Sequence, residues 1–314
     1  MDSDGRFVVS GQIRTHEQGS GIMTQSDWVI RPATPADRSA VLALINAVQP
    51  HIPWSTDQYE WQFTAGTAGA AEVRVVECDN TLVSLYVGTR KHLWVNGEIL
   101  PGIMVQDVLT HPNYRGKGML NALTTSFLNE MRERNECGYT FPNKLSENSF
   151  RRSGWSEVMP VPALECNIAS QERATDLAIE ISAFDSSVDT IWPAAGFRVG
   201  VVRSAKFLNW RYTRPSNVYR RFIVPDVGFY ILKTYDRGTQ KVMHICDLVL
   251  YERARELCRS ILTSVKSLAA QSGASLLTCW IPLGHPYRHL FEDMGFAPDV
   301  RNDRFMFATG PTRL

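Results

Sequence analysis

The sequence predicts a mixed α/β fold (α+β mixed), with a central, mostly antiparallel sheet and flanking helices, in two tandem domains. Three observations lead to this prediction. Short segments of alternating apolar and polar residues are joined by Asp-Asn and Asn-Gly pairs, as in antiparallel hairpins. Longer segments repeat apolar residues at helical spacing. The order of these segments recurs once in the second half of the chain.

Composition narrows the class of protein. The 314 residues suffice for two domains, and 33 Lys plus Arg against 32 Asp plus Glu leave a net charge of +1. So small a net charge creates no overall positive potential that would attract nucleic acid or an anionic membrane. We therefore expect neither partner. The sequence has no apolar run of about 18 residues that could span a bilayer and no signal-peptide core. We therefore expect a cytoplasmic protein.

The cysteines and histidines form no metal or disulfide pattern. The six cysteines lack Cys-x-x-Cys spacing, so we expect buried free thiols in a reducing compartment. No metal site is expected, because ligand spacing is also missing among the histidines His51, His92, His244, His285 and His289.

The predicted domains follow the order of the elements. Residues 1–26 have no periodicity and are interpreted as a disordered tail or extension, with Met23 as an alternative start. The N-terminal domain is expected over residues 27–168 and the C-terminal domain over 169–314. The first begins with a strand at Trp28, followed by a helix that Thr34 caps.

An antiparallel meander and a glycine turn come next. The expected strands are 72–77, 81–88, the hairpin 93–100 around Asn96-Gly97, and 103–110. A helix is expected over 120–131, ended by Gly138, then a strand over 139–143, a helix over 146–153 and a strand to Asn167.

The segment His111-Pro112-Asn113-Tyr114-Arg115-Gly116-Lys117-Gly118 stands between a strand and a helix. Its two glycines allow a tight turn whose N–H groups point outward together at a helix start, where an anion is favoured. Arg115 and Lys117 add positive charge. The glycine spacing fits neither a P-loop nor a dinucleotide fingerprint. We predict a phosphate-binding turn.

Asn113 to Gly118 resembles the (Gln/Arg)-x-x-Gly-x-(Gly/Ala) signature of the GNAT (Gcn5-related N-acetyltransferase) superfamily, with Asn113 departing at the first position. The opening Ile30 to Asp37 and the later Gly154-Trp155 are also similar to that superfamily. The resemblance implies a GNAT fold, acetyl-CoA or another acyl-CoA as cosubstrate and no metal. It further implies N-acyl transfer to a primary amine of a small molecule, such as an amino sugar or amino-acid derivative. A non-catalytic acyl-CoA-binding or sensor protein is the alternative, and a homodimer is left open.

The resemblance also assigns roles to residues. The expected acyl-CoA-binding residues are Val108, Leu109, Thr110, Arg115, Gly116, Lys117, Gly118, Met119 and Asn143. Asn143 is equally well explained as a turn residue after Pro142. Family members commonly use a tyrosine as the proton donor to the thiolate at the position of Phe150, so that acid is missing here, and Ser146, Ser149 or Tyr139 is the expected substitute.

Asp107 is the candidate base, because an apolar strand next to the cofactor edge favours a proton-accepting carboxylate. The competing interpretation is structural. Asp247 occupies the equivalent place in the second half, and 47 residues separate Asp107 from Gly154 as 48 separate Asp247 from Gly295. No glycine follows the second strand, over residues 251–256, so the second copy is expected to have lost the cofactor.

Overall fold

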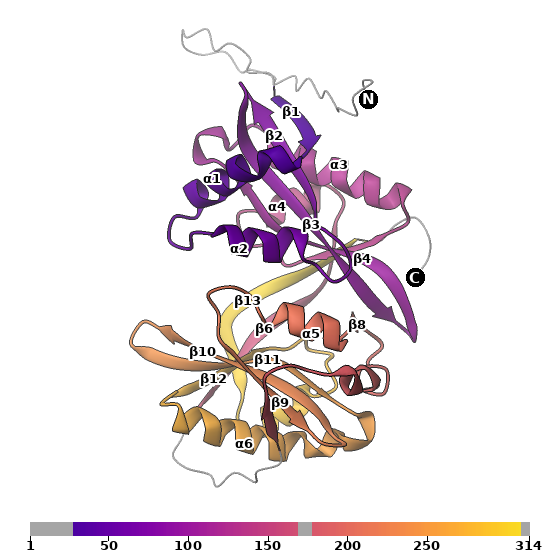
Figure 1. Ribbon diagram of the computed structural model, residues 1–314, viewed down its shortest axis with the longest axis vertical. Helices are drawn as coiled ribbons and strands as arrows, with labels where there is room; N and C mark the ends of the chain where they lie inside the picture. Colours follow the sequence, from indigo (N-terminus) through magenta and orange to yellow (C-terminus); the bar gives the residue numbers. More distant parts are fainter. Residues whose placement is uncertain (1–27, 169–177, 309–314) are drawn as a thin grey trace. The chain divides into compact units, whose positions relative to one another are not determined.

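The computed structural model describes residues 28–168 and 178–308, and the predicted tail over residues 1–26 lies outside them. The chain forms two compact units (Figure 1). Unit 1 contains the described residues 28–90, 103–156 and 307–308, and unit 2 contains 91–102, 157–168 and 178–306. Each unit has a mainly antiparallel sheet with helices on it, so the predicted mixed α/β class is confirmed.

Unit 1 has the strand order β1-β2-β3-β4-β5. Its elements are β1 (Trp28–Pro32), the 3-10 helix η1 (Pro35–Asp37), α1 (Arg38–Val48), α2 (Thr56–Tyr59), the π-helix η2 (Glu60–Thr64), β2 (Glu72–Cys78), β3 (Thr81–Val95), β4 (Glu98–Thr110), the 3-10 helix η3 (Pro112–Tyr114), α3 (Met119–Glu133), β5 (Cys137–Thr140) and α4 (Glu147–Arg152). The outer ends of β3 and β4 belong to unit 2.

Alternating side chains of β2 and β3 cover the two faces of this sheet. Val75 and Leu85 pack with α1 in one buried cluster. Their neighbour Tyr86 points to the other face, where its ring lies 5.1 Å from that of Phe127 in α3. Successive residues of a strand point to opposite faces, so one sheet supports α1 on one side and α3 on the other.

Unit 2 has the strand order β6-β12-β11-β10-β9-β7. Its elements are β6 (Ser156–Asn167), β7 (Ile179–Ile181), the 3-10 helix η4 (Ser186–Thr190), β8 (Val199–Val201), α5 (Ala205–Arg211), β9 (Tyr219–Val224), β10 (Gly228–Arg237), β11 (Gln240–Leu250), the 3-10 helix η5 (Glu252–Leu257), α6 (Cys258–Gln271), β12 (Leu276–Trp280), α7 (Arg288–Asp293) and the start of β13 (Ala297–Ala308).

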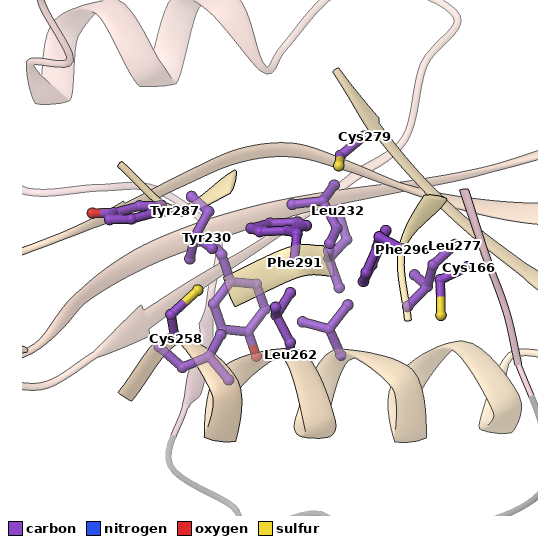
Figure 2. Close-up of a cluster of buried hydrophobic side chains, with 14 of the residues drawn as sticks. Cys166, Tyr230, Leu232, Cys258, Leu262, Leu277, Cys279, Tyr287, Phe291 and Phe296 are labelled. Carbon is purple, nitrogen blue, oxygen red and sulfur yellow. The ribbon is translucent and has the colours of Figure 1, made fainter. Parts of the chain in front are cut away.

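The same alternation builds the core of unit 2. Tyr230 and Leu232 of β10 pack with Leu262 of α6 and Phe291 of α7 in the cluster that Figure 2 shows. Ile231, between the first two, belongs to a second cluster on the other face, which includes residues of α5 and η4. Both faces of the sheet are therefore buried.

The unit boundary differs from the predicted one between residues 168 and 169. Strand β6, expected in the first domain, pairs antiparallel with β12 and buries Leu164 and Cys166 in the core of unit 2. The hairpin tip around Asn96 also belongs to unit 2, where the Trp94 indole N–H donates to the Phe197 carbonyl at 2.9 Å. Partners so distant in sequence leave no local signal.

Three element boundaries also differ from the prediction. The strands expected around the Asn96-Gly97 turn are continuous with their neighbours, as β3 and β4. Helix α3 continues past the expected residue 131 to Glu133 and ends before Asn135, which has a φ of 54°, so Gly138 does not end it. Gly138 lies inside β5 instead, where a Cβ would overlap the Met131 side chain of α3. Asn143 falls beyond β5, which ends at Thr140.

All six cysteines are free, as expected. Five are buried and Cys246 is half-buried. Across residues 28–168 and 178–308, no helix combines the length and the apolar character needed to cross a membrane.

Unit 1 has a partly buried ion-pair network centred on Glu72. Its carboxylate lies 2.5 Å from Arg90 and 3.1 Å from Arg134, and both arginines also contact Glu136. The Glu72 side chain is only 13% exposed, so its pairs are shielded from water. Arg74 lies 3.8 Å from the same carboxylate, so removing it would leave three guanidinium groups with one shared partner fewer.

We expect Glu72→Gln to lower the free energy of unfolding by about 1–3 kcal/mol, because partly buried charges lose a partner. Chemical denaturation of the full chain measures this. Glu147→Gln is the matched control, since Glu147 pairs with Arg151 at 3.0 Å on an exposed helix face and should cost less than about 0.5 kcal/mol. Equal effects of the two changes would contradict the central role of Glu72.

Two half-buried histidines of unit 2 stay neutral in the folded state above about pH 4. Burial lowers the pKa of His244 and that of His285, each from 6.5 to about 4. The His244 Nδ1 lies 2.7 Å from the Thr278 hydroxyl, and the His285 Nδ1 accepts from the Tyr287 N–H at 3.2 Å. In the unfolded chain both rings take up a proton near pH 6.5.

Stability of unit 2 should therefore fall as the pH drops from about 6.5 to about 4, because the unfolded state binds protons first. Each histidine contributes a slope of at most about 1.4 kcal/mol per pH unit. Denaturation midpoints across this range, compared between the wild type and His244→Gln, test the effect. The variant should show the shallower slope, and an unchanged slope would refute the assignment to His244.

Candidate functional site

The turn between β4 and α3 has the backbone that its glycines allow. Gly116 and Gly118 both have a φ of 78°, in the left-handed region where side chains are disfavoured. Gly118 is also the N-cap of α3. A Cβ at either glycine would meet no atom within 4 Å, so the backbone angle, and not crowding by the protein, calls for glycine here. The space beside the turn is therefore open to a ligand.

A cleft of about 560 Å³ lies beside this turn, entirely within unit 1. All nine residues predicted to bind acyl-CoA line it, together with residues from α1, from the loop after β5 and from α4. The lining residues are Val48, Gln49, Val108, Leu109, Thr110, Tyr114, Arg115, Gly116, Lys117, Gly118, Met119, Leu120, Asn121, Asn143, Leu145, Ser146, Ser149 and Arg152.

Hydrogen bonds hold the end of β4 at the edge of the cleft. The Ser84 hydroxyl of β3 donates to the Leu109 carbonyl at 2.9 Å and lies 2.8 Å from the Thr110 hydroxyl. The Arg115 Nε donates to the Thr110 carbonyl at 3.1 Å. The His111 N–H donates to the Val83 carbonyl at 2.8 Å, which fixes the exit of the chain into the turn.

The four catalytic candidates differ in their position. Ser149 lines the cleft. Tyr139 is only 8% exposed, its ring lies edge-on to that of Phe141, and it is not part of the lining. Asp107 is also outside the lining, although it neighbours Val108, and the Gln62 side-chain amide donates to its carboxylate at 3.1 Å. The structure thus brings Ser146 and Ser149 to the cleft.

Asp107 has an unusual backbone. Its φ is 52° although it lies within β4, a conformation that asparagine and aspartate adopt more readily than other non-glycine residues. Its counterpart Asp247 forms an ion pair with Arg203 at 2.8 Å and accepts from the Tyr212 hydroxyl at 3.0 Å. These contacts explain Asp247 as a structural residue of unit 2.

Phe150, at the position where the resemblance expects a tyrosine, is part of the core. It is 1% exposed, and its ring lies 6.2 Å from that of Tyr86 and 5.3 Å from that of Trp155. The departure from tyrosine is therefore a core substitution.

Asn143 begins the turn that leads into α4. Its side-chain oxygen accepts from the Leu145 N–H at 3.0 Å and from the Ser146 N–H at 3.1 Å. These hydrogen bonds fit the interpretation of Asn143 as a turn residue. Asn143 also lines the cleft, as its predicted role in binding acyl-CoA requires.

Several lining residues were not predicted. Val48 and Gln49 come from the end of α1, far from the glycine turn in sequence, and no local signal connects them with it. Arg152 lies three residues after Ser149 on α4. Positions three apart share a helix face, so this spacing offered a signal once Ser149 was a candidate.

The corresponding edge in unit 2 is closed by the protein itself. The Tyr251 N–H donates to the Val227 carbonyl at 2.8 Å, matching the bond of His111 in unit 1. The preceding residue, Leu250, donates its N–H to the Tyr287 hydroxyl at 3.1 Å, and the same hydroxyl donates to the Leu250 carbonyl at 3.3 Å. Because Tyr287 is 1% exposed, its hydroxyl is a permanent part of the core.

No group of three or more His, Cys, Asp or Glu side chains in the described part of the chain is arranged to hold a metal ion. The chemistry that the cleft offers in the structure comes from backbone N–H groups, hydroxyls, amides and cations.

Residues 29–158 match the family of the acetyltransferase (GNAT) domain. Three solved structures each align with 90% of this chain. They are a GCN5-related N-acetyltransferase from Anabaena variabilis (12% identity, TM-score 0.69), another from Kribbella flavida (14% identity, TM-score 0.63) and Eis1 from Mycobacterium abscessus (14% identity, TM-score 0.61). The alignments cover 72%, 71% and 73% of those chains, respectively. No curated protein sequence matches the chain. At these identities the structures show a shared fold, which confirms the predicted resemblance.

Proposed function

From the premise that residues 29–158 are a GNAT acetyltransferase domain, we propose that unit 1 is an acyl-CoA-dependent N-acyltransferase, most simply an N-acetyltransferase. Its acceptor would be a primary amine of a small molecule, such as an amino sugar or amino-acid derivative. The cleft beside the glycine turn carries the proposal. Among the described residues that line it are three cations, Arg115, Lys117 and Arg152, and no carboxylate.

The glycine turn suits a pyrophosphate. Left-handed angles at Gly116 and Gly118 direct N–H groups outward at the start of α3, where the helix dipole adds positive potential. The Lys117 ammonium lies 5.1 Å from the Tyr114 ring centre, which holds it beside the turn. The arm of the acyl-CoA would then lie along the edge at Leu109 and Thr110.

The reaction needs few protein groups. The amine nitrogen attacks the thioester carbon, the C–S bond breaks, the nitrogen loses a proton and the thiolate gains one. Ser149 is the proposed donor to the thiolate, because its hydroxyl belongs to the cleft while Phe150 is buried. A thiolate is a good leaving group, so a weak acid is sufficient.

Gly118→Asp should weaken CoA binding about a hundredfold, or roughly 3 kcal/mol, because it places a carboxylate where phosphate would bind. Calorimetric titration of the full chain with CoA measures this, and the wild type should bind one CoA per chain.

Gly273→Asp is the matched control. Gly273 has a φ of 74° and open space around it, so the change adds the same charge and similar backbone strain in unit 2. It should leave CoA affinity unchanged. Two sites per chain, or a site that survives Gly118→Asp, would refute the assignment of the cleft.

Acetyl-CoA with a panel of small amines should release free thiol, and Ser149→Ala should lower kcat about a hundredfold with little change in the KM for acetyl-CoA. Ser146→Ala is the comparison, because the Ser146 hydroxyl already donates to the Asn143 side chain and should matter less for turnover. A full rate in Ser149→Ala would remove Ser149 from the mechanism.

The burial of Phe150 favours a second candidate function, a non-catalytic acyl-CoA-binding protein. Such a protein would keep the phosphate-binding turn without a proton donor at the thioester. CoA binding that depends on Gly118, together with background thiol release for every amine, would support this alternative over the transferase.

A further inference from the structure

The three cations of the unit 1 cleft come from two different elements. Arg115 and Lys117 belong to the glycine turn, whereas Arg152 is the last residue of α4. A pyrophosphate bound at the turn has the first two as neighbours. Arg152 therefore adds positive charge to a part of the cleft built by another helix.

The contacts of these side chains also differ. The Arg115 Nε is bonded to the Thr110 carbonyl, and Lys117 lies over the Tyr114 ring. Arg152 is exposed, and within residues 28–168 and 178–308 it has no carboxylate partner. Its neighbour Arg151 has its Nε 3.0 Å from the Glu147 carboxylate. The guanidinium of Arg152 thus keeps its donors for a ligand.

We propose that Arg152 binds the ribose 3′-phosphate of CoA, so that the cleft selects CoA over dephospho-CoA. This inference rests on the proposed function. CoA carries a pyrophosphate and, apart from it, a phosphate monoester. An arginine fork binds a phosphate with two parallel hydrogen bonds. The monoester carries more negative charge than either single phosphate of the pyrophosphate. No lining carboxylate among the described residues opposes that charge.

The test is calorimetric titration of the full chain with CoA and with dephospho-CoA, for the wild type, Arg152→Gln and Arg151→Gln. The wild type should bind CoA about tenfold more tightly than dephospho-CoA. Arg152→Gln should weaken CoA binding about tenfold and leave dephospho-CoA binding unchanged, which removes the preference. Arg151→Gln should preserve the preference, although it removes the same charge one residue away.

Each other outcome overturns the inference. Equal loss of affinity for both ligands in Arg152→Gln would mean that Arg152 acts only through the general field of the cleft. Equal loss of preference in the two variants would mean that position 152 has no special role. A wild type that binds both ligands equally would refute 3′-phosphate selection alone, whereas a wild type that binds neither would refute the proposed function itself.

Discussion

The left-handed turn at Gly116 and Gly118 is the constraint on which the unit 1 site depends. It lets the chain leave β4 and start α3 with open space beside both glycines. The surrounding contacts position this turn: Ser84 fixes the end of β4, and His111 anchors the exit of the strand to β3. The rigid scaffold and the open turn together make the cleft.

Both units use a sheet buried on two faces, but they use the end of the equivalent strand differently. In unit 1 the end of β4 at Thr110 lines a cleft. In unit 2 the end of β11 at Leu250 is bonded to Tyr287, and the following 3-10 helix has no glycine. These contacts support the interpretation of the second copy as one without cofactor. The end of the strand thus lines a cleft in unit 1 and packs against a buried tyrosine in unit 2.

Local chemistry made the glycine turn and the strand before it predictable, because glycine spacing and apolar alternation act over a few residues. Pairings between distant segments were not predictable: β6 reads as the last strand of the first domain until its pairing with β12 is seen. Arg152 was missed for a related reason. Its spacing of three residues from Ser149 places both on one face of α4, but only the fold shows that this face lines the cleft while Arg151 pairs with Glu147.

The closed edge at Leu250 has a consequence for how the two units persist in a cell. A strand end that is hydrogen-bonded to the protein's own buried tyrosine gains no stability from an added ligand. A cleft that binds a ligand gains stability by mass action, with the logarithm of the ligand concentration once this exceeds the Kd. On the proposed function, the lifetime of unit 1 against proteolysis would follow the supply of acyl-CoA, while unit 2 would remain a constant framework.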